Sequence, residues 1–183
     1  MQAAQDMFIE RGFEGVSMAD IAERLGTSRP TIYGYFASTE TILDALFEDR
    51  LVPVPRRIIG MLPKDQYLNY HFLLEALVKE KEALALLHSG GGPLFHARKQ
   101  AFLKEIAEEV QDQYQEQYQV LLPEDQRTLL FPLVLNLLIT VAYQNAISEK
   151  MVDLLARFIH SGIIGIAKNN QVQAQAAENA GRI

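Results

Sequence analysis

The sequence contains no cysteine, which excludes a disulfide framework, thiolate chemistry and any cysteine-ligated metal site. It also lacks long uninterrupted apolar runs. The longest, Leu129 to Tyr143, is shorter than a membrane-spanning helix and contains Pro132, Asn136 and Thr140. No signal peptide is recognisable at the N-terminus. We therefore expect a soluble cytoplasmic protein, and 183 residues suffice for one small and one medium-sized domain.

Basic residues are scarce. The chain has 17 Lys and Arg against 23 Asp and Glu, a net charge of −6, and residues 1–52 hold four basic against nine acidic residues, a local charge of −5. Because phosphate neutralisation dominates non-specific affinity for DNA, this balance argues against strong electrostatic binding to nucleic acid. The segment from Gly26 to Tyr35 differs, since it carries Arg29 and no acidic residue. Any DNA contact is expected there, with modest affinity.

Residues 17–36, SMADIAERLGTSRPTIYGYF, predict two short helices joined by a tight turn. Ser17 and the acid three residues later fit a capping box at the start of the first helix. Gly26 follows the last apolar residue of that helix, where a left-handed helix end favours glycine. Thr27 or Ser28 can cap the second helix. This layout places the head of one helix in the DNA major groove, although an ordinary helical hairpin has the same pattern.

The exposed side of this helix pair carries the candidate DNA contacts. Arg29 is the candidate for direct base readout, because a guanidinium pairs with O6 and N7 of guanine. Thr31 can meet a thymine methyl group or a base edge. Hydroxyl groups and helix N-terminal amides are expected to hold phosphates and fix the register, although Tyr33 is also compatible with partial burial that exposes only its hydroxyl. The full set is Ser17, Thr27, Ser28, Arg29, Thr31, Tyr33, Tyr35 and Thr39.

Several landmarks at fixed offsets extend this pattern beyond the helix pair. They are Gly12–Phe13 at the end of the first helix, the Met18-x-x-Ile21-Ala22 core, Gly26, and Tyr33-x-Tyr35-Phe36. On these residues, the stretch 3–52 resembles the DNA-binding domain of TetR-type transcriptional repressors. The resemblance implies an all-α fold. Its parts would be a three-helix helix-turn-helix domain at 1–52, an α-helical ligand-binding and dimerisation domain at 53–170, and a polar tail at 171–183.

Two features depart from the family pattern. Family members usually carry a lysine just after the serine that opens the fourth helix, where it touches a phosphate, whereas this chain has Thr39. They also tend to have a basic segment before the first helix, so the resemblance implies that native residues precede Met1. Both departures weaken phosphate binding without changing the helix that would read bases.

Periodic apolar residues predict further helices at 54–62, 65–88, 94–121, 124–147 and 149–168. The first is expected to be a connector with Arg56 and Arg57 solvated. The second is apolar on more than one side, which is typical of a helix at the centre of a bundle. The SGGGP segment at 89–93 lacks the features of a phosphate-binding loop, so a loop or hinge is expected. We expect the polar tail to be frayed or disordered.

The last two predicted helices carry more apolar surface than one bundle can bury. The candidates for a second buried face are Leu133, Leu137, Val141, Phe158, Ile159, Gly162, Ile163 and Ile166. A two-fold homodimer through a four-helix bundle would bury them, and the family resemblance implies the same; an intramolecular core is the alternative. Such a dimer would present two DNA-reading helices, one from each copy. If these lie about one DNA turn (~34 Å) apart, they would match a palindromic operator.

Side chains that bring polar groups among apolar ones are candidates for lining a ligand pocket in the predicted bundle. They are Tyr67, His71, His88, Phe95, Phe102, Tyr114, Asn136 and Tyr143, although ordinary cores and surfaces contain the same residue types. The four histidines lack metal-ligand spacing, so no metal or other cofactor is expected. A small-molecule effector would act by favouring one spacing of the two DNA-reading helices in the dimer. The helix carrying Leu46, Phe47 and Arg50 is placed to transmit that shift.

These observations favour a DNA-binding transcriptional regulator, a repressor released by a small-molecule effector. A helical enzyme is one alternative, but the sequence shows no nucleophile–base motif and no paired catalytic acids, so we do not expect an enzyme. A dimeric helical ligand-binding module with weak or lost DNA binding is the other. The negative charge and Thr39 keep that alternative open.

Overall fold

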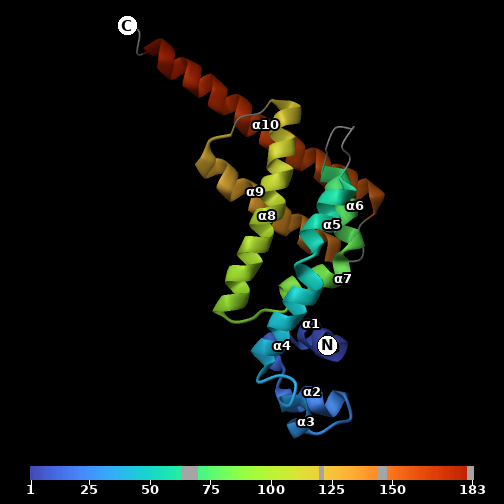
Figure 1. Ribbon diagram of the computed structural model, residues 1–183. Coiled ribbons are helices and arrows are strands. Elements are labelled where there is room, and N and C mark those ends of the chain that lie inside the picture. Colours follow the sequence, from blue (N-terminus) through green and yellow to red (C-terminus); the bar gives the residue numbers. More distant parts are fainter. Residues whose placement is uncertain (63–69, 120–121, 144–147, 181–183) are drawn as a thin grey trace. The chain divides into compact units, whose positions relative to one another are not determined.

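The computed structural model describes residues 1–62, 70–119, 122–143 and 148–180, and within these ranges it contains helices and no strand (Figure 1). The residues form two compact units. Unit 1 comprises residues 1–60 and 80–105, and unit 2 comprises the described parts of 61–79 and 106–183. This grouping follows packing alone, and the division into domains at residues 52 and 170 stays a prediction.

Unit 1 is built from short helices and tight helical turns. Its α-helices are α1 (Gln2–Arg11), α2 (Met18–Arg24), α3 (Arg29–Tyr33), α4 (Thr39–Leu46), α5 (Val54–Met61), α7 (Lys81–Leu84) and the first half of α8 (Pro93–Tyr118). Two 3₁₀ turns, η1 (Phe13–Gly15) and η3 (Ala85–His88), and a π-helical turn, η2 (Phe47–Leu51), connect them.

Local sequence signals explain the helix ends around α2 and α3. Ser17 and Asp20 form the predicted capping box at the start of α2, and Gly26 follows that helix with a φ of 63°. Ser28 rather than Thr27 caps α3, because its side chain accepts a hydrogen bond from the Thr31 amide. Ser38 caps α4 in the same manner. The predicted helix-turn-helix boundaries are therefore confirmed.

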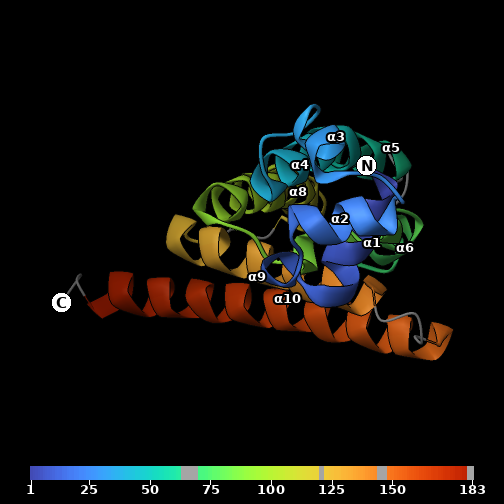
Figure 2. The same cartoon turned by 90° about the horizontal axis from the view of Figure 1, so that it is seen from below.

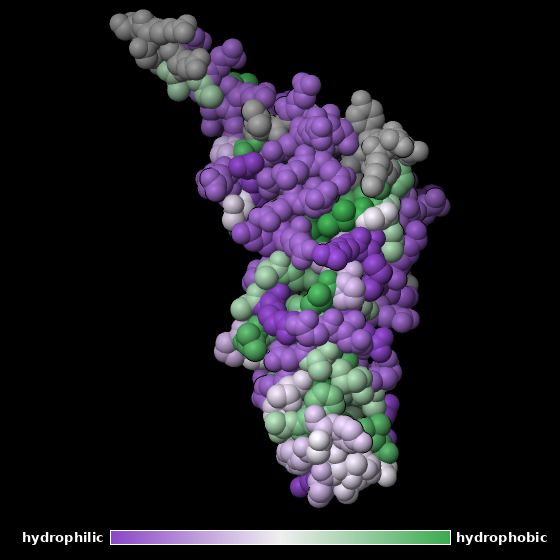
Figure 3. Space-filling model, viewed as in Figure 1, coloured by the Kyte–Doolittle hydropathy of each residue, from purple (hydrophilic) through white to green (hydrophobic). Residues whose placement is uncertain are grey.

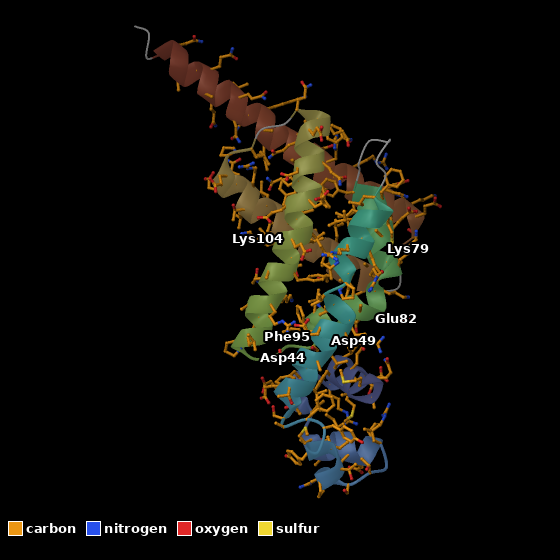
Figure 4. All side chains as sticks on the ribbon, viewed as in Figure 1. Asp44, Asp49, Lys79, Glu82, Phe95 and Lys104 are labelled. Carbon is orange, nitrogen blue, oxygen red and sulfur yellow. The ribbon has the colours of Figure 1, made fainter. Side chains whose placement is uncertain are left out.

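The core of unit 1 joins the N-terminal helices to the segment 80–105. Phe8 and Phe13 pack with ring centroids 5.4 Å apart, and Phe47 meets Phe95 and Phe102 edge-on at 5.7 and 6.5 Å. Figure 4 labels Asp44 and Phe95 where α4 faces the beginning of α8. The other fully buried side chains include Met7, Ile42, Leu46, Leu51, Ile58, Leu84 and Leu86.

The prediction of one long helix over 65–88 is wrong. Within its described part, α6 (Tyr70–Lys79) ends at Glu80, whose φ and ψ of −100° and 9° are not helical, and α7 and η3 follow. The apolar residues on more than one side of this segment belong to two cores. Leu73, Leu74 and Leu77 are buried in unit 2, whereas Leu84, Leu86 and Leu87 are buried in unit 1. The predicted residues 65–69 lie outside the described residues.

The connector at 54–62 is confirmed as α5, and both of its arginines are exposed as predicted. Arg57, whose side chain is 44% exposed, also donates two hydrogen bonds to the Glu80 carboxylate, at 2.7 and 2.6 Å. These bonds raise the pKa of Arg57 above its ordinary value. The pair fastens α5 to the residue where the chain leaves α6.

Unit 2 contains α6, the second half of α8, α9 (Glu124–Tyr143) and α10 (Glu149–Ala180), with α9 and α10 both packed against α6 (Figure 1). α9 runs unbroken through Pro132 and buries Phe131, Leu135, Leu138, Ile139 and Ala142. By length and composition α9 could span a membrane, unlike the shorter apolar run judged from the sequence. One side of α9 packs against α6, and 28% of its most apolar stretch is buried.

The tail was expected to be frayed or disordered, and the described part of it is helical. α10 continues past residue 170 to Ala180 as one 32-residue helix, the long red helix of Figure 2. The reason is helix propensity, because the sequence QVQAQAAENA is rich in Ala, Gln and Glu. Its residues 171–177 are exposed, and Figure 3 colours this stretch mostly hydrophilic.

Candidate DNA-binding surface and ligand-binding region

α3 presents its polar side chains to solvent. Arg29, Thr31 and Tyr33 are exposed, while Ile32 points into the core and is 8% exposed. One apolar anchor on a five-residue helix therefore fixes which side faces outward. Figure 2 looks onto α2 and α3 of unit 1. Tyr35 follows α3 and is 79% exposed.

An open groove of about 530 Å³ lies between the N-terminal ends of α2 and α4, beside α3. It is lined by Val16, Ser17, Met18, Ala19, Arg29, Tyr33, Ala37, Ser38 and Thr39. Four of the eight predicted DNA-binding residues, Ser17, Arg29, Tyr33 and Thr39, thus meet at one groove. Two helix N-termini and a guanidinium converge there, which is a suitable environment for a phosphate group.

Some hydrogen-bond donors at this groove already donate to acidic side chains. Asp20 Oδ2 accepts hydrogen bonds from the Ser17 amide at 2.8 Å and from its hydroxyl at 2.5 Å. These bonds lower the pKa of Asp20, and bonds from Ser38 lower the pKa of Glu40. Because the Ser17 hydroxyl donates to a carboxylate, it has no proton left to donate to a phosphate in this conformation. The groove is therefore less receptive to phosphate than its residue types suggest.

The other predicted DNA-binding residues lie on the exposed side of α3. Ser28 Oγ and Thr31 Oγ1 are 2.8 Å apart and share a hydrogen bond. Thr27 is half-buried, and its amide donates to the Ala22 carbonyl at 2.9 Å. Tyr33 is 54% exposed, so more than its hydroxyl reaches solvent. Arg29 and Tyr33 are the side chains in this set that combine exposure with a place at the groove.

The predicted dimer residues divide between a core face and an exposed face. On α10, Ile159 and Ile163 are 5% and 3% exposed and pack inside unit 2, so they form the intramolecular core that was the alternative. Phe158 and Gly162 are exposed on another side of that helix. On α9, Leu133, Leu137 and the half-buried Val141 line one side at four-residue steps. Exposed apolar residues that the prediction omitted join them, namely Leu129, Met151, Leu154 and Val172, while Ile166 lies at the edge with 37% exposure.

The predicted pocket residues fall in both units, and one of them lies outside the described residues. Phe95 and Phe102 belong to unit 1, where they pack on Phe47, and His88 is exposed there. In unit 2, His71 lies between two carboxylates, with Nε2 3.3 Å from Glu75 and Nδ1 3.1 Å from Asp153. The remaining predicted residues are scattered: Asn136 is half-buried, Tyr143 is exposed, Tyr67 lies outside the described residues, and Tyr114 lies in α8.

Unit 2 contains a small apolar cavity that the sequence did not indicate. It is lined by Tyr70, Leu73, Ala107, Val110, Phe131, Val134 and Leu135, from α6, α8 and α9. Its volume of about 10 Å³ is roughly what one water molecule needs. Tyr70 supplies its only polar side chain. Helical spacing predicts that several of these residues are buried in the core. Only the packing of the three helices shows which of them line a cavity.

Comparison with known proteins agrees with the helix-turn-helix geometry. The family model described as bacterial regulatory proteins, tetR family, matches residues 1–46. The uncharacterized HTH-type transcriptional regulator YvdT of Bacillus subtilis (strain 168) is 30% identical over 98 residues, which are 49% of this chain and 50% of YvdT. The similarity to the tetR family thus concerns the first 46 residues, which contain the helix-turn-helix.

Two further relatives show how far the similarity extends. The tetracycline repressor protein class A from transposon 1721 of Escherichia coli is 39% identical to this chain over 51 residues, 28% of the chain and 24% of the repressor. The chain thus spans half or less of the length of these curated relatives. The crystal structure of the TetR family transcriptional regulator PfmR from Thermus thermophilus is 18% identical, with a TM-score of 0.63 over 87% of this chain and 94% of PfmR. At that identity the likeness concerns the fold.

Within the described residues, no group of three or more His, Asp or Glu side chains is arranged to hold a metal ion. The two carboxylates beside His71 approach different ring nitrogens, so they do not converge on one point. Sequence inspection also missed Ser38, which lines the groove next to Thr39. Its capping role was the available signal, because a capping serine stands at a helix N-terminus.

Proposed function

We propose that this chain is a DNA-binding transcriptional regulator that works as a homodimer, and that it is a repressor released by a small-molecule effector. The exposed side of α3 beside the groove between α2 and α4 carries this proposal. Arg29 reads a guanine there, and Thr31 contacts a base edge or a thymine methyl group. Tyr33, Tyr35, Thr27 and the capping serines hold the backbone and fix the register.

The apolar side shared by α9 and α10 supports the homodimer. Leu133, Leu137 and Phe158 are 57%, 44% and 73% exposed, which is unusual for large apolar side chains gathered on two neighbouring helices. Gly162 lies on the same side and lets a second backbone approach closely. A two-fold dimer through this surface presents two α3 helices to a palindromic operator with half-sites ~34 Å apart.

The effector proposal is supported by a relative. The protein from transposon 1721 is named a tetracycline repressor. The apolar cavity of unit 2 has room for about one water molecule, so effector binding requires the helices around it to move apart. Effector binding shifts the two DNA-reading helices only if the effector prefers one conformation of the dimer. The protein then acts in the cytoplasm through binding and not through catalysis.

A dimeric helical ligand-binding module with weak or lost DNA binding is the second candidate. Thr39 stands where relatives of this family usually have a phosphate-binding lysine. In addition, the Ser17 hydroxyl donates its hydrogen bond to the Asp20 carboxylate. Both features lower the affinity for any DNA. Neither touches Arg29, which is why we prefer the regulator.

Fluorescence anisotropy with the purified full chain distinguishes the two candidates. The labelled duplexes are overlapping fragments of the DNA upstream of its own coding sequence, with scrambled duplexes of equal length as controls. We expect one fragment to bind at least about 1000-fold more tightly than scrambled DNA, at the lower end for specific regulators. Equal and weak binding to all fragments, with an intact dimer, would support the ligand-binding module instead.

A further inference from the structure

Arg98, in the second turn of α8, makes three contacts with the end of α4 and the turn that follows. Its Nη1 lies 3.2 Å from Asp44 Oδ1 and its Nη2 lies 2.6 Å from Glu48 Oε1. The guanidinium carbon also sits 4.1 Å from the centre of the Phe47 ring. A planar guanidinium suits this combination of two carboxylates and one aromatic face, which lysine cannot reproduce.

Two phenylalanines on the same helix hold Arg98 in place. Phe95 and Phe102 lie one turn before and one turn after it, and both meet the Phe47 ring edge-on. The arginine side chain is 22% exposed, whereas the Asp44 and Glu48 side chains are 40% and 65% exposed, so salt screens both ion pairs. The stacking on the buried Phe47 ring is the contact shielded from water.

The backbone on the α4 side departs from an ordinary helix at the same residue. The Val52 amide donates to the Phe47 carbonyl at 3.0 Å, an i→i+5 bond, so the π-helical turn η2 begins where Arg98 binds. Such turns are frequent at functional sites because a shift of one residue converts them into α-helix. Arg98 contacts a residue on each side of this junction, Asp44 in α4 and Glu48 in η2.

α4 connects the Arg98 contacts with the candidate DNA-binding surface of the same unit. The opposite end of α4 begins at Ser38, which lines the DNA groove.

We propose that Arg98 is a positioning residue for the DNA-reading helices, acting through α4. With its three contacts made, Arg98 holds α4 and the π turn in the arrangement that presents α3 to DNA. Loss of these contacts releases α4 and lowers operator affinity. This inference rests on the proposed regulatory function, and it assigns the positioning of α4 to one side chain.

The test compares four variants with the wild-type full chain. Arg98→Ala removes all three contacts, and Arg98→Lys keeps the charge but loses the two-pronged and stacked geometry. Arg98→Glu reverses the charge, and the double variant Arg98→Glu with Glu48→Arg restores one ion pair in the opposite sense. Arg57→Ala is the matched control, because it removes a two-pronged arginine–carboxylate pair of unit 1 that does not touch α4.

Operator affinity is measured by anisotropy at several salt concentrations, with the active fraction of each preparation found by stoichiometric titration. We expect Arg98→Ala to weaken operator binding about 10-fold and Arg98→Glu more, in the range of ordinary couplings between sites. The charge-swapped double variant should regain most of the loss, and Arg57→Ala should bind within about 2-fold of wild type. The salt dependence should keep its slope, because a lost phosphate contact would reduce it by about 0.9.

Hydrogen exchange of the α4 amides is measured on the same variants without DNA. We expect faster exchange in Ile42–Leu46 for Arg98→Ala and Arg98→Glu, and near wild-type exchange for the charge-swapped variant and Arg57→Ala. Unchanged exchange in α4, a reduced salt slope, or an equal loss of affinity in Arg57→Ala would each overturn the role of Arg98. If the wild-type chain binds no DNA, the proposed function fails, and the exchange data still decide whether Arg98 orders α4.

Discussion

The backbone amide of Phe13 donates a hydrogen bond to the carbonyl of Ser89, with an N···O distance of 2.5 Å. A second bond of this kind joins the Gln5 side chain to the Glu82 carbonyl at 3.2 Å. The turn after α1 is therefore fastened to the segment that precedes α8. The N-terminal helices do not complete their core alone, because residues 80–105 close it. We therefore expect changes in residues 80–105 to affect the core beneath the helix-turn-helix.

Gly12 permits the turn that makes the Phe13–Ser89 bond. Its φ of 75° and ψ of 156° fall in a region that side chains strongly disfavour. A Cβ there would lie 3.7 Å from the Ser89 oxygen, so the cost is backbone strain and not a clash. We expect Gly12→Ala to lower the free energy of unfolding by about 1–3 kcal/mol. Urea denaturation followed by circular dichroism measures the change.

Gly15→Ala is the control for this prediction. Gly15 also lies in η1, but its φ is not positive and an added Cβ would make an ordinary 3.5 Å contact with Arg11 Cβ. We expect it to change stability by less than about 1 kcal/mol, since alanine restricts the unfolded chain. Equal destabilisation by the two substitutions would contradict the strain at Gly12.

Arg29→Ala tests base readout. Arg29 is exposed at the groove, and a guanidinium that pairs with guanine contributes about 1–3 kcal/mol of discrimination. We expect the variant to bind the operator more weakly and to tolerate substitution at one operator position. Binding to scrambled DNA should fall much less. Anisotropy on a set of single-substitution operators measures both effects.

Two other variants serve as references for Arg29. Arg56→Ala removes an exposed arginine of α5 and should leave both operator and scrambled binding within about 2-fold, like most surface changes. Tyr33→Phe removes a hydroxyl assigned to the DNA backbone and should weaken all sequences about equally. If Arg29→Ala also weakens all sequences equally, Arg29 contacts phosphate and not a base.

Local chemistry made the helix-turn-helix predictable. The capping serines, Gly26 and the apolar spacing of Met18 and Ile21 each act within a few residues, so the sequence alone determines their effect. The break at Glu80 was not predictable in this way. The sequence 65–88 has a helical apolar pattern throughout, and only the presence of two cores explains why α6 and α7 are separate helices. The ligand-pocket residues stay a prediction, because aromatic residues such as Phe95 pack on partners far along the chain.

Dimer residues were predicted in part. Apolar excess on the last two helices was visible in the sequence, but which apolar residues face inward depends on the rotation of α10 against α6. Ile159 and Ile163 turned out to be core, and their neighbour Phe158 faces solvent. Successive residues of a helix point in directions about 100° apart, so Phe158 and Ile159 can have different roles. The sequence does not specify how α10 is rotated against α6.

The capping box of α2 predicts a defined acid sensitivity. Hydrogen bonds from Ser17 lower the pKa of Asp20 below its ordinary 3.8 in the folded chain. The stabilisation by its carboxylate is therefore fully present above pH 3.8 and is lost as the pH falls through the lower folded value. Asp20→Asn should flatten the pH dependence of stability in that acidic window and leave its shape above pH 5 unchanged. Urea denaturation from pH 2.5 to 7 tests this, and identical curve shapes for both proteins would contradict it.

Phe158→Glu tests the homodimer. The side chain is 73% exposed in the isolated chain, so a glutamate there is tolerated by the fold of the monomer. In a dimer through α9 and α10 the same carboxylate would be buried against apolar side chains such as Leu133 and Leu137, which is strongly unfavourable. We expect the dimer dissociation constant to rise at least about 30-fold, the effect of a 2 kcal/mol hot spot. Analytical ultracentrifugation at micromolar concentration measures it, with circular dichroism confirming the same helix content.

Gln171→Glu adds the same charge on a different side of α10 and is the matched control. It should leave the dissociation constant unchanged within about 2-fold, as expected for a surface substitution outside an interface. Operator affinity supplies the functional readout, because a monomer contacts one half-site only. If Phe158→Glu dissociates the dimer and operator binding falls with it, the apolar side of α9 and α10 pairs the two DNA-reading helices. A dimer that survives Phe158→Glu unchanged must instead form through another surface, and the spacing of the α3 helices would have to be derived from that one.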